Sequence, residues 1–289
     1  MKTPHPRPWP SPEAEAALLA ALSSRPCGLF SDMDGVLSPI VDSPDAAVLA
    51  PGALGALVAA QRSFAAVGII SGRDPRDLWR MAPAPGLIYA GNHGFERLTL
   101  DFGGAFRVET IPEAQPWRDP VHQALEALRA ELGPALPGAI FEDKGVTASL
   151  HVRQTADPET AERAALAAAR RVARRYGLRV TRGRLVVELR PPITINKGIV
   201  ITSLCRERGL RGVIYLGDDR TDMDAFHAIR RLATETPEFH AASVAVLSDE
   251  APPGLARAAD VTVTGVTGVV ALLEWLAGRA ASRDGGAPA

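Results

Sequence analysis

Two aspartates stand two residues apart at the end of an early apolar run. Asp32 and Asp34 frame the segment DMDG, residues 32–35, directly after the run 28–31. Carboxylates placed this close behind a buried strand repel each other unless a positive charge lies between them. Mg²⁺ is the simplest candidate, because it prefers carboxylate oxygens. One carboxylate could then attack phosphorus while the other transfers protons. The alternative is a pair of aspartates that cap a turn or helix.

A second acidic segment, GDDRTDMD at residues 217–224, follows the apolar run 213–216. Its four carboxylates lie within seven residues and repel one another strongly. A surface loop could solvate them. A position at the end of a buried strand instead favours metal coordination.

Two other segments offer groups that could bind an anion. Ser71, Gly72 and Arg73 lie between the apolar run 65–70 and a predicted helix, where a hydroxyl and N–H groups are aided by the helix dipole. Lys197 stands at the start of another predicted helix, where an ammonium opposes the dipole and could serve a bound anion. An ordinary helix cap and a solvated lysine are the alternatives.

The apolar runs supply a scaffold that can bring these four segments together. Buried runs alternate with helical periodicity up to residue 112 and again after residue 191, which is typical of a parallel α/β sheet. Ligands bind at the carboxyl ends of the strands in such sheets. We therefore expect Asp32 and Asp218 to hold a metal at adjacent strand ends, with Ser71 and Lys197 on phosphate oxygens, as phosphoryl transfer requires.

The pattern changes between residues 113 and 190. Two helical segments, 117–132 and 158–176, are interspersed with strand-like runs at 139–142, 146–152, 178–180 and 185–189. We expect an α/β protein with a Rossmann-like parallel core and an inserted α+β cap domain. The expected parts are a lead-in and helix (1–23), a core (24–112 and 191–280), a cap (113–190) and a disordered tail (281–289).

Composition excludes several classes of protein. With 32 basic and 33 acidic residues the formal net charge is -1, which argues against a dedicated nucleic-acid binder. Two cysteines make no disulfide framework, and no apolar run reaches the roughly 20 residues that span a bilayer. We expect a cytoplasmic monomer without nucleic-acid or membrane partners. Three of the basic residues are lysines, and two of them, Lys144 and Lys197, fall inside motifs.

The four segments, in this order, resemble the haloacid dehalogenase-type (HAD) phosphatase superfamily. Over about residues 28–270 the chain is most similar to the trehalose-6-phosphate phosphatase branch of that superfamily. The fragments that carry this closer resemblance are ISGR (70–73), GNHG (91–94), FEDK (141–144), SLHVR (149–153), VELRP (187–191), NKG (196–198) and GDDRTD (217–222). Val36 and Met223 depart from the usual threonine and acidic residue but remove no expected ligand or nucleophile.

The resemblance implies a role for each matching residue. Asp32 would be the nucleophile that becomes an aspartyl-phosphate, and Asp34 the acid and base, whose backbone carbonyl also meets the metal. Asp218 would bind Mg²⁺ directly, and Asp222 would support the metal, through water or through its neighbours. The residues implied for phosphate are Ser71, Gly72 and Lys197. Those implied for the sugar are Arg73, Asn92, His93, Glu142, Lys144, Arg153 and Glu188.

The implied reaction is hydrolysis of trehalose 6-phosphate to trehalose and phosphate, the last step of trehalose biosynthesis, beneath a mobile cap. One alternative is a phosphatase of another sugar phosphate, such as sucrose phosphate or a glucosylglycerate-type phosphate. Another is a non-catalytic regulatory protein that binds a sugar phosphate. For Glu142 and Lys144 the structural alternative is ion pairing on an exposed sheet. For His93 it is a structural hydrogen bond.

Overall fold

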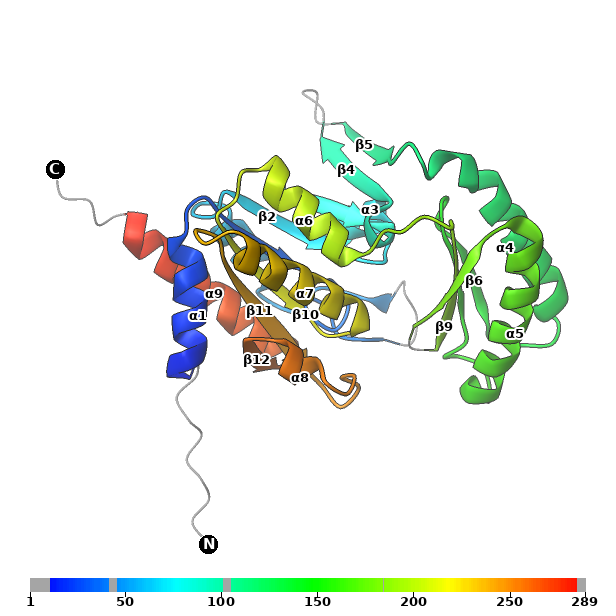
Figure 1. The fold of residues 1–289 in the computed structure, drawn as a ribbon. Helices are drawn as coiled ribbons and strands as arrows, with labels where there is room; N and C mark the ends of the chain where they lie inside the picture. The colour runs from blue at the N-terminus through cyan, green and yellow to red at the C-terminus, as the bar shows by residue number, and fades with distance from the viewer. Residues whose placement is uncertain (1–10, 42–45, 101–104, 184, 285–289) are drawn as a thin grey trace, which may run out of the picture.

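The computed structural model describes residues 11–41, 46–100, 105–183 and 185–284. Within them the chain forms two sheets, an eight-stranded one and a four-stranded one (Figure 1). Residues 1–10 of the expected lead-in and residues 285–289 of the expected tail lie outside the described ranges.

The eight-stranded sheet has six parallel strands and two antiparallel strands at one edge. In spatial order the strands are β12 (Val261–Thr264), β11 (His240–Leu247), β10 (Gly212–Gly217), β1 (Cys27–Ser31), β2 (Ala66–Ile70), β3 (Ile88–Gly91), β4 (Glu96–Leu100) and β5 (Phe106–Thr110). The three neighbours β10, β1 and β2 are buried along their whole length, as their continuous apolar sequences predict. Their carboxyl ends therefore lie side by side.

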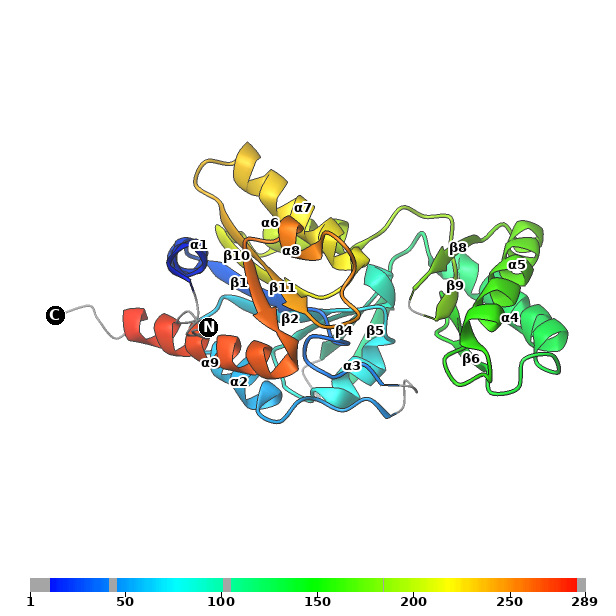
Figure 2. The ribbon, with the colours of Figure 1, turned by 90° about the horizontal axis from the view of Figure 1, so that it is seen from below.

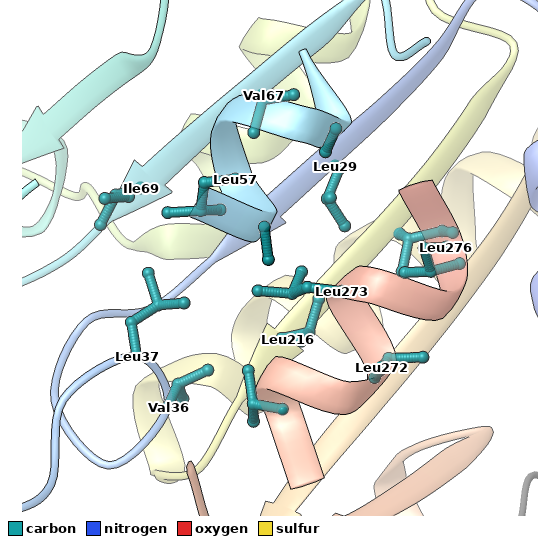
Figure 3. Close-up of a cluster of buried hydrophobic side chains, with 14 of the residues drawn as sticks. Leu29, Val36, Leu37, Leu57, Val67, Ile69, Leu216, Leu272, Leu273 and Leu276 are labelled. Atoms are coloured by element: carbon teal, nitrogen blue, oxygen red, sulfur yellow. The ribbon is translucent and has the colours of Figure 1, made fainter. Parts of the chain in front are cut away.

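Helices cover both faces of this sheet (Figure 2). One apolar cluster joins it to α1 (Pro12–Ser23), α2 (Ala53–Ala60), α3 (Pro75–Met81) and α9 (Gly265–Asp284). A second cluster joins it to α6 (Lys197–Glu207), α7 (Arg220–Glu235) and α8 (Leu255–Ala258). In the first cluster Leu57 of α2 and Leu273 of α9 meet Leu29 of β1 (Figure 3). Its neighbour Phe30 belongs to the other cluster, because successive side chains of a strand point to opposite faces.

The helices and strands of a separate antiparallel unit, the cap, span residues 118–190, which lies within the predicted range of 113–190. This unit leaves the core after β5 and returns before α6. Its strands, in spatial order, are β6 (Ile140–Asp143), β7 (Ala148–His151), β9 (Val186–Arg190) and β8 (Arg179–Arg182). Its helices are α4 (Arg118–Leu132) and α5 (Pro158–Tyr176), which pack on one face of the small sheet. The cap stands beyond the end of the large sheet near α3, β4 and β5 (Figures 1 and 2).

The predicted helices and strands are present, and α5 has the bounds predicted from its periodicity. The expected tail over 281–289 is wrong for residues 281–284, which continue α9. The short helix α8 and the 3-10 turn Asn92–Gly94 were not predicted. Among the described residues, no helix combines the length and the apolar character needed to cross a membrane.

Candidate active site

Three buried carboxylates converge at the carboxyl ends of the central strands. Asp32 follows β1, Asp218 follows β10, and Asp222 lies in the first turn of α7. The Asp32 N–H donates to the Leu216 carbonyl at 2.9 Å, which fixes the two strand ends together. One oxygen of each carboxylate lies within 4.8 Å of the others. The strand-end geometry expected from the sequence is therefore present.

Lys197 places one ammonium between two of these carboxylates. Its Nζ lies 2.6 Å from Asp32 Oδ2 and 2.7 Å from Asp222 Oδ1, and the residue is 2% exposed. Asn196 caps α6, its Oδ1 accepting the Ile199 N–H at 2.9 Å. Asn196 thus serves as the N-cap of α6. Lys197, at the first helical position, points toward the carboxylates instead.

Asp222 organises the loop rather than facing open space. Its Oδ1 accepts from Lys197 Nζ and, at 2.8 Å, from the Tyr215 hydroxyl. Its Oδ2 accepts the N–H groups of Asp218 and Asp219, both at 3.0 Å. Each oxygen already has two donors, so this carboxylate is better suited to support a metal site than to bind a metal directly. Asp219 completes a capping box with it at the start of α7.

Charge in this cluster is unevenly balanced. Burial, with repulsion from neighbouring carboxylates, raises the pKa of Asp32 and Asp222 despite the lysine between them. Burial opposes the charge on Lys197 as well, but Asp222 and Asp32 outweigh it and raise its pKa. Burial also opposes ionisation of Asp219, but Lys197 and hydrogen bonds lower its pKa to about 2. A charged lysine among several buried carboxylates leaves a deficit of positive charge that a divalent cation, with its preference for carboxylate oxygens, would fill.

Asp34 lies at the edge of the cluster and pairs with Arg73. The guanidinium Nε and Nη2 donate to the two carboxylate oxygens at 2.7 and 2.8 Å, a bidentate pair. The turn that carries Asp34 passes very close to Asp218. A Cβ at Gly35, whose φ is 77°, would lie 2.1 Å from Asp218 Oδ2, so this position requires glycine.

The Ser71-Gly72 turn follows β2, the next strand along. Ser71 is 2% exposed, and its Oγ accepts the Arg73 N–H at 3.4 Å. The His93 ring packs against the turn, since a Cβ at Gly72 would lie 2.6 Å from the ring. Of the expected phosphate residues, Ser71 and Gly72 thus follow β2, the neighbour of β1, and Lys197 begins α6.

The cap turns a row of polar side chains away from its helices. The register pairs Glu142 with Ser149, Ser149 with Glu188, and Glu188 with Thr181, one residue from each strand. The opposite face carries apolar side chains that pack on α4 and α5. Ser149 and Thr181 hydroxyls donate to Glu188 at 3.3 and 3.2 Å. The alternation of the cap strands therefore builds a hydrogen-bonding face.

This polar face meets the core at the Ser71-Gly72 turn. Lys144 Nζ donates to the Gly72 carbonyl at 3.2 Å and lies 3.7 Å from Glu142 and 3.6 Å from Glu188. His93 Nε2 lies 3.2 Å from Glu188. Lys144 follows the last residue of β6, so it stands in the turn between β6 and β7. The structure brings all four of these expected sugar residues beside Gly72.

Electrostatics keep the two cap glutamates ionised. Burial opposes the charge on Glu142, but the His151 hydrogen bond and the Lys144 ammonium outweigh it and lower the pKa. Burial likewise opposes the charge on Glu188, and His93 together with Lys144 lowers its pKa well below 4.5. Both carboxylates are hydrogen-bond acceptors over the ordinary range of pH.

Two expected sugar residues lie apart from this face. Asn92 is fully buried, with both ends of its amide hydrogen-bonded inside the protein, so its environment does not support direct contact with a ligand. Arg153 lies 3.7 Å from Glu250, which belongs to the core domain and stands in the loop after β11. The two side chains form an ion pair between the cap and the core.

Two residues in supporting positions were not predicted. His151 Nε2 lies 2.7 Å from Glu142 Oε2, and Tyr215 supports Asp222. Strand alternation could have placed His151 on the polar face, because it stands two residues from Ser149 in β7. A tyrosine inside a buried strand also needs a hydroxyl partner, which was the signal for Tyr215.

Comparison with known proteins gives consistent matches. The family model described as trehalose-phosphatase matches residues 30–253. A trehalose-phosphate phosphatase of Mycobacterium bovis (strain BCG / Pasteur 1173P2) is 38% identical over 264 residues, 86% of this chain. The chain spans 65% of that relative's length.

Solved structures share the fold. The C-terminal domain of the Candida albicans trehalose-6-phosphate phosphatase superposes with a TM-score of 0.72 at 21% identity, covering 92% of this chain and 96% of that one. A haloacid dehalogenase-like hydrolase from Bacteroides thetaiotaomicron gives a TM-score of 0.58 at 15% identity, covering 86% and 98%. The architecture is therefore the haloacid dehalogenase-like one, a parallel core with an inserted cap.

Proposed function

Since the chain belongs to the trehalose-phosphatase family, we propose that it hydrolyses trehalose 6-phosphate to trehalose and phosphate. The observation that carries this proposal is the meeting of two unlike surfaces. A cluster of buried aspartates around Lys197 lies on the core side, and a row of carboxylates and hydroxyls lies on the cap side. The first suits a phosphate with its metal. The second suits sugar hydroxyls, which both donate and accept hydrogen bonds.

The reaction proposed for the core has two steps. An Asp32 oxygen attacks phosphorus as the bond to the sugar oxygen breaks, which leaves an aspartyl-phosphate, and Asp34 gives the leaving oxygen its proton. Water activated by Asp34 then attacks phosphorus, which releases phosphate and restores Asp32. In the structure Arg73 donates to both carboxylate oxygens of Asp34. Donating a proton in the first step requires that pair to open.

In this proposal, two sets of groups stabilise the negative charge of the transferred phosphoryl group. Lys197 and the Ser71-Gly72 turn bind its oxygens. Mg²⁺, held by Asp32, Asp218 and the Asp34 carbonyl with support from Asp222, would neutralise charge on the phosphoryl oxygens when bound. The donor set fits this ion, because it is made of buried carboxylate oxygens with one ammonium among them.

On the cap side, Glu142, Glu188 and Lys144 are proposed to grip the sugar hydroxyls, with His93 aligning Glu188. Arg153 is proposed to contact the substrate or to close the cap through Glu250. Charged groups recognise neutral hydroxyls well when they are already buried and oriented, as the hydrogen bonds to Glu142 and Glu188 indicate.

A phosphate-release screen over sugar phosphates tests the proposal. Trehalose 6-phosphate should be among the best substrates with Mg²⁺, and EDTA should stop turnover. Asp32→Asn should abolish release while the circular dichroism spectrum and Tm stay near wild type. Poor turnover of trehalose 6-phosphate beside rapid turnover of another sugar phosphate would reject the substrate. Full activity of Asp32→Asn would reject the covalent mechanism.

A further inference from the structure

The side chain of Asn92 joins the core to the cap. It lies in the 3-10 turn after β3 and is fully buried. Its Nδ2 donates to Glu96 Oε2 at 2.6 Å and to the Lys144 carbonyl at 3.0 Å, while its Oδ1 accepts from the Thr147 hydroxyl at 3.0 Å. Lys144 and Thr147 flank the β6–β7 turn of the cap. One core amide therefore holds that turn at two points.

The residue type matches this position. Asn92 has a φ of 49°, in the left-handed region that asparagine tolerates better than most residues with a side chain. A carbonyl, a carboxylate and a hydroxyl surround it, and a primary amide can serve all three because it has two donors and an acceptor on one short stem. An isosteric aspartate would place two carboxylates 2.6 Å apart in a buried site.

Glu96 extends the connection to the linker that leads into the cap. The residue is 2% exposed, and besides Asn92 its carboxylate accepts from Thr110 Oγ1 at 2.8 Å and Arg118 Nη2 at 2.6 Å. Thr110 is the last residue of β5 and Arg118 the first of α4. Asn92 and Glu96 thus fix both the entry into the cap and the turn that carries Lys144. A buried network with every member satisfied is rigid and sets one geometry.

Lys144 is the residue through which this connection reaches the site. Asn92 holds its carbonyl, and its ammonium donates to the Gly72 carbonyl of the Ser71-Gly72 turn. We infer that Asn92 is a positioning residue, which acts through Lys144 to set where the polar face of the cap lies over the phosphate site. This inference rests on the proposed function, in which that face binds the sugar.

The first experiment uses two variants of Thr147, a fully buried cap residue. Thr147→Val keeps the shape but loses the hydroxyl, and Thr147→Ser keeps the hydroxyl. With trehalose 6-phosphate, kcat/KM should fall about tenfold in the valine variant and stay within about twofold in the serine variant. With p-nitrophenyl phosphate, which has no sugar, both variants should stay within about twofold of wild type. Equal losses on both substrates would mean general structural damage and would overturn the inference.

The second experiment is a double-mutant cycle between Asn92→Ala and Lys144→Ala. If Asn92 acts through Lys144, adding Asn92→Ala to Lys144→Ala should lower kcat/KM for trehalose 6-phosphate by less than about twofold. Losses that multiply would overturn the inference.

Amide hydrogen exchange over residues 143–148 separates this inference from the proposed function. Exchange should be faster in Thr147→Val than in Thr147→Ser, whatever the substrate is. Unchanged exchange would overturn the connection itself. A wild-type enzyme that turns over p-nitrophenyl phosphate but not trehalose 6-phosphate would reject the proposed substrate. The connection would then be judged by the exchange rates.

Discussion

Replacing Tyr215 by phenylalanine removes one hydroxyl from behind the carboxylate cluster. That hydroxyl donates to Asp222 Oδ1 at 2.8 Å, and both side chains are fully buried. Hydrogen bonds to charged groups contribute about 1.5–3 kcal/mol to stability. Lys197 and two backbone N–H groups still serve Asp222, so we expect the lower half, about 1.5–2 kcal/mol. At about 2–4 °C per kcal/mol, the Tm should fall by about 3–8 °C.

The same hydroxyl should matter for catalysis, because Lys197 bonds to the same oxygen of Asp222. Without Tyr215 that oxygen can shift and take the ammonium with it. We expect kcat for phosphate release at saturating trehalose 6-phosphate and Mg²⁺ to fall about tenfold, equivalent to about 1.4 kcal/mol. Urea unfolding and initial-rate assays measure the two effects separately.

Tyr89 offers a matched control. It is also fully buried, and its hydroxyl donates to the neutral carbonyl of Ala82 near the end of α3. Tyr89→Phe should lower stability by about 1 kcal/mol and leave kcat within about twofold of wild type. If Tyr215→Phe kept wild-type kcat, or if both variants lost kcat equally, the reasoning that Tyr215 positions Lys197 through Asp222 would be refuted.

Three further predictions follow from the charges of the site. Added Mg²⁺ should raise the Tm of the wild-type protein and not that of Asp218→Asn in thermal scans with and without EDTA, whereas equal shifts would remove Asp218 from the metal site. His151→Gln weakens the hydrogen bond to Glu142, so KM for trehalose 6-phosphate should rise about fivefold while p-nitrophenyl phosphate turnover stays unchanged. A lower kcat at constant KM would contradict this prediction. The folded-state pKa of Glu188 lies well below the ordinary value of 4.5, so its ionised form stabilises the protein above that value, and this contribution is lost as the pH falls through the folded-state pKa. Between about pH 5 and about pH 3 the Tm of wild type should therefore fall more than that of Glu188→Gln, and parallel curves would argue against the assignment.

The core of the site could be predicted because the motifs of Asp32, Ser71 and Asp218 each follow an apolar run. A buried parallel strand has a continuous apolar sequence, and the carboxyl ends of parallel strands meet at one edge of a sheet. Asp32 and Asp218 therefore come together although 186 positions separate them, and their strands are hydrogen-bonded neighbours.

Sequence could not show contacts that depend on how the cap seats on the core. Asn92 reads as a polar residue in a glycine-rich turn, which suits a ligand contact as well as an internal one. Its partners Lys144 and Thr147 lie 52 and 55 residues away, in another domain. The direction of a side chain at such a junction is set by packing between two units. It cannot be predicted from the sequence around that residue alone.

In the proposed function, Lys197 would be a fixed cation for the phosphate and Lys144 an adjustable one for the sugar. The ion pairs of 2.6 and 2.7 Å from the Lys197 ammonium to Asp32 and Asp222 hold that ammonium in place. Lys144 lies 3.6 Å or more from its two glutamates and makes its hydrogen bond to the Gly72 carbonyl. Its remaining N–H groups can therefore turn toward a sugar hydroxyl without breaking a tight ion pair. An ammonium can do this because its three donors rotate about one bond, whereas a guanidinium presents a flat fork of fixed direction. In a chain whose other basic residues are almost all arginines, lysine occurs at the two positions where a compact cation must fit between a pair of carboxylates.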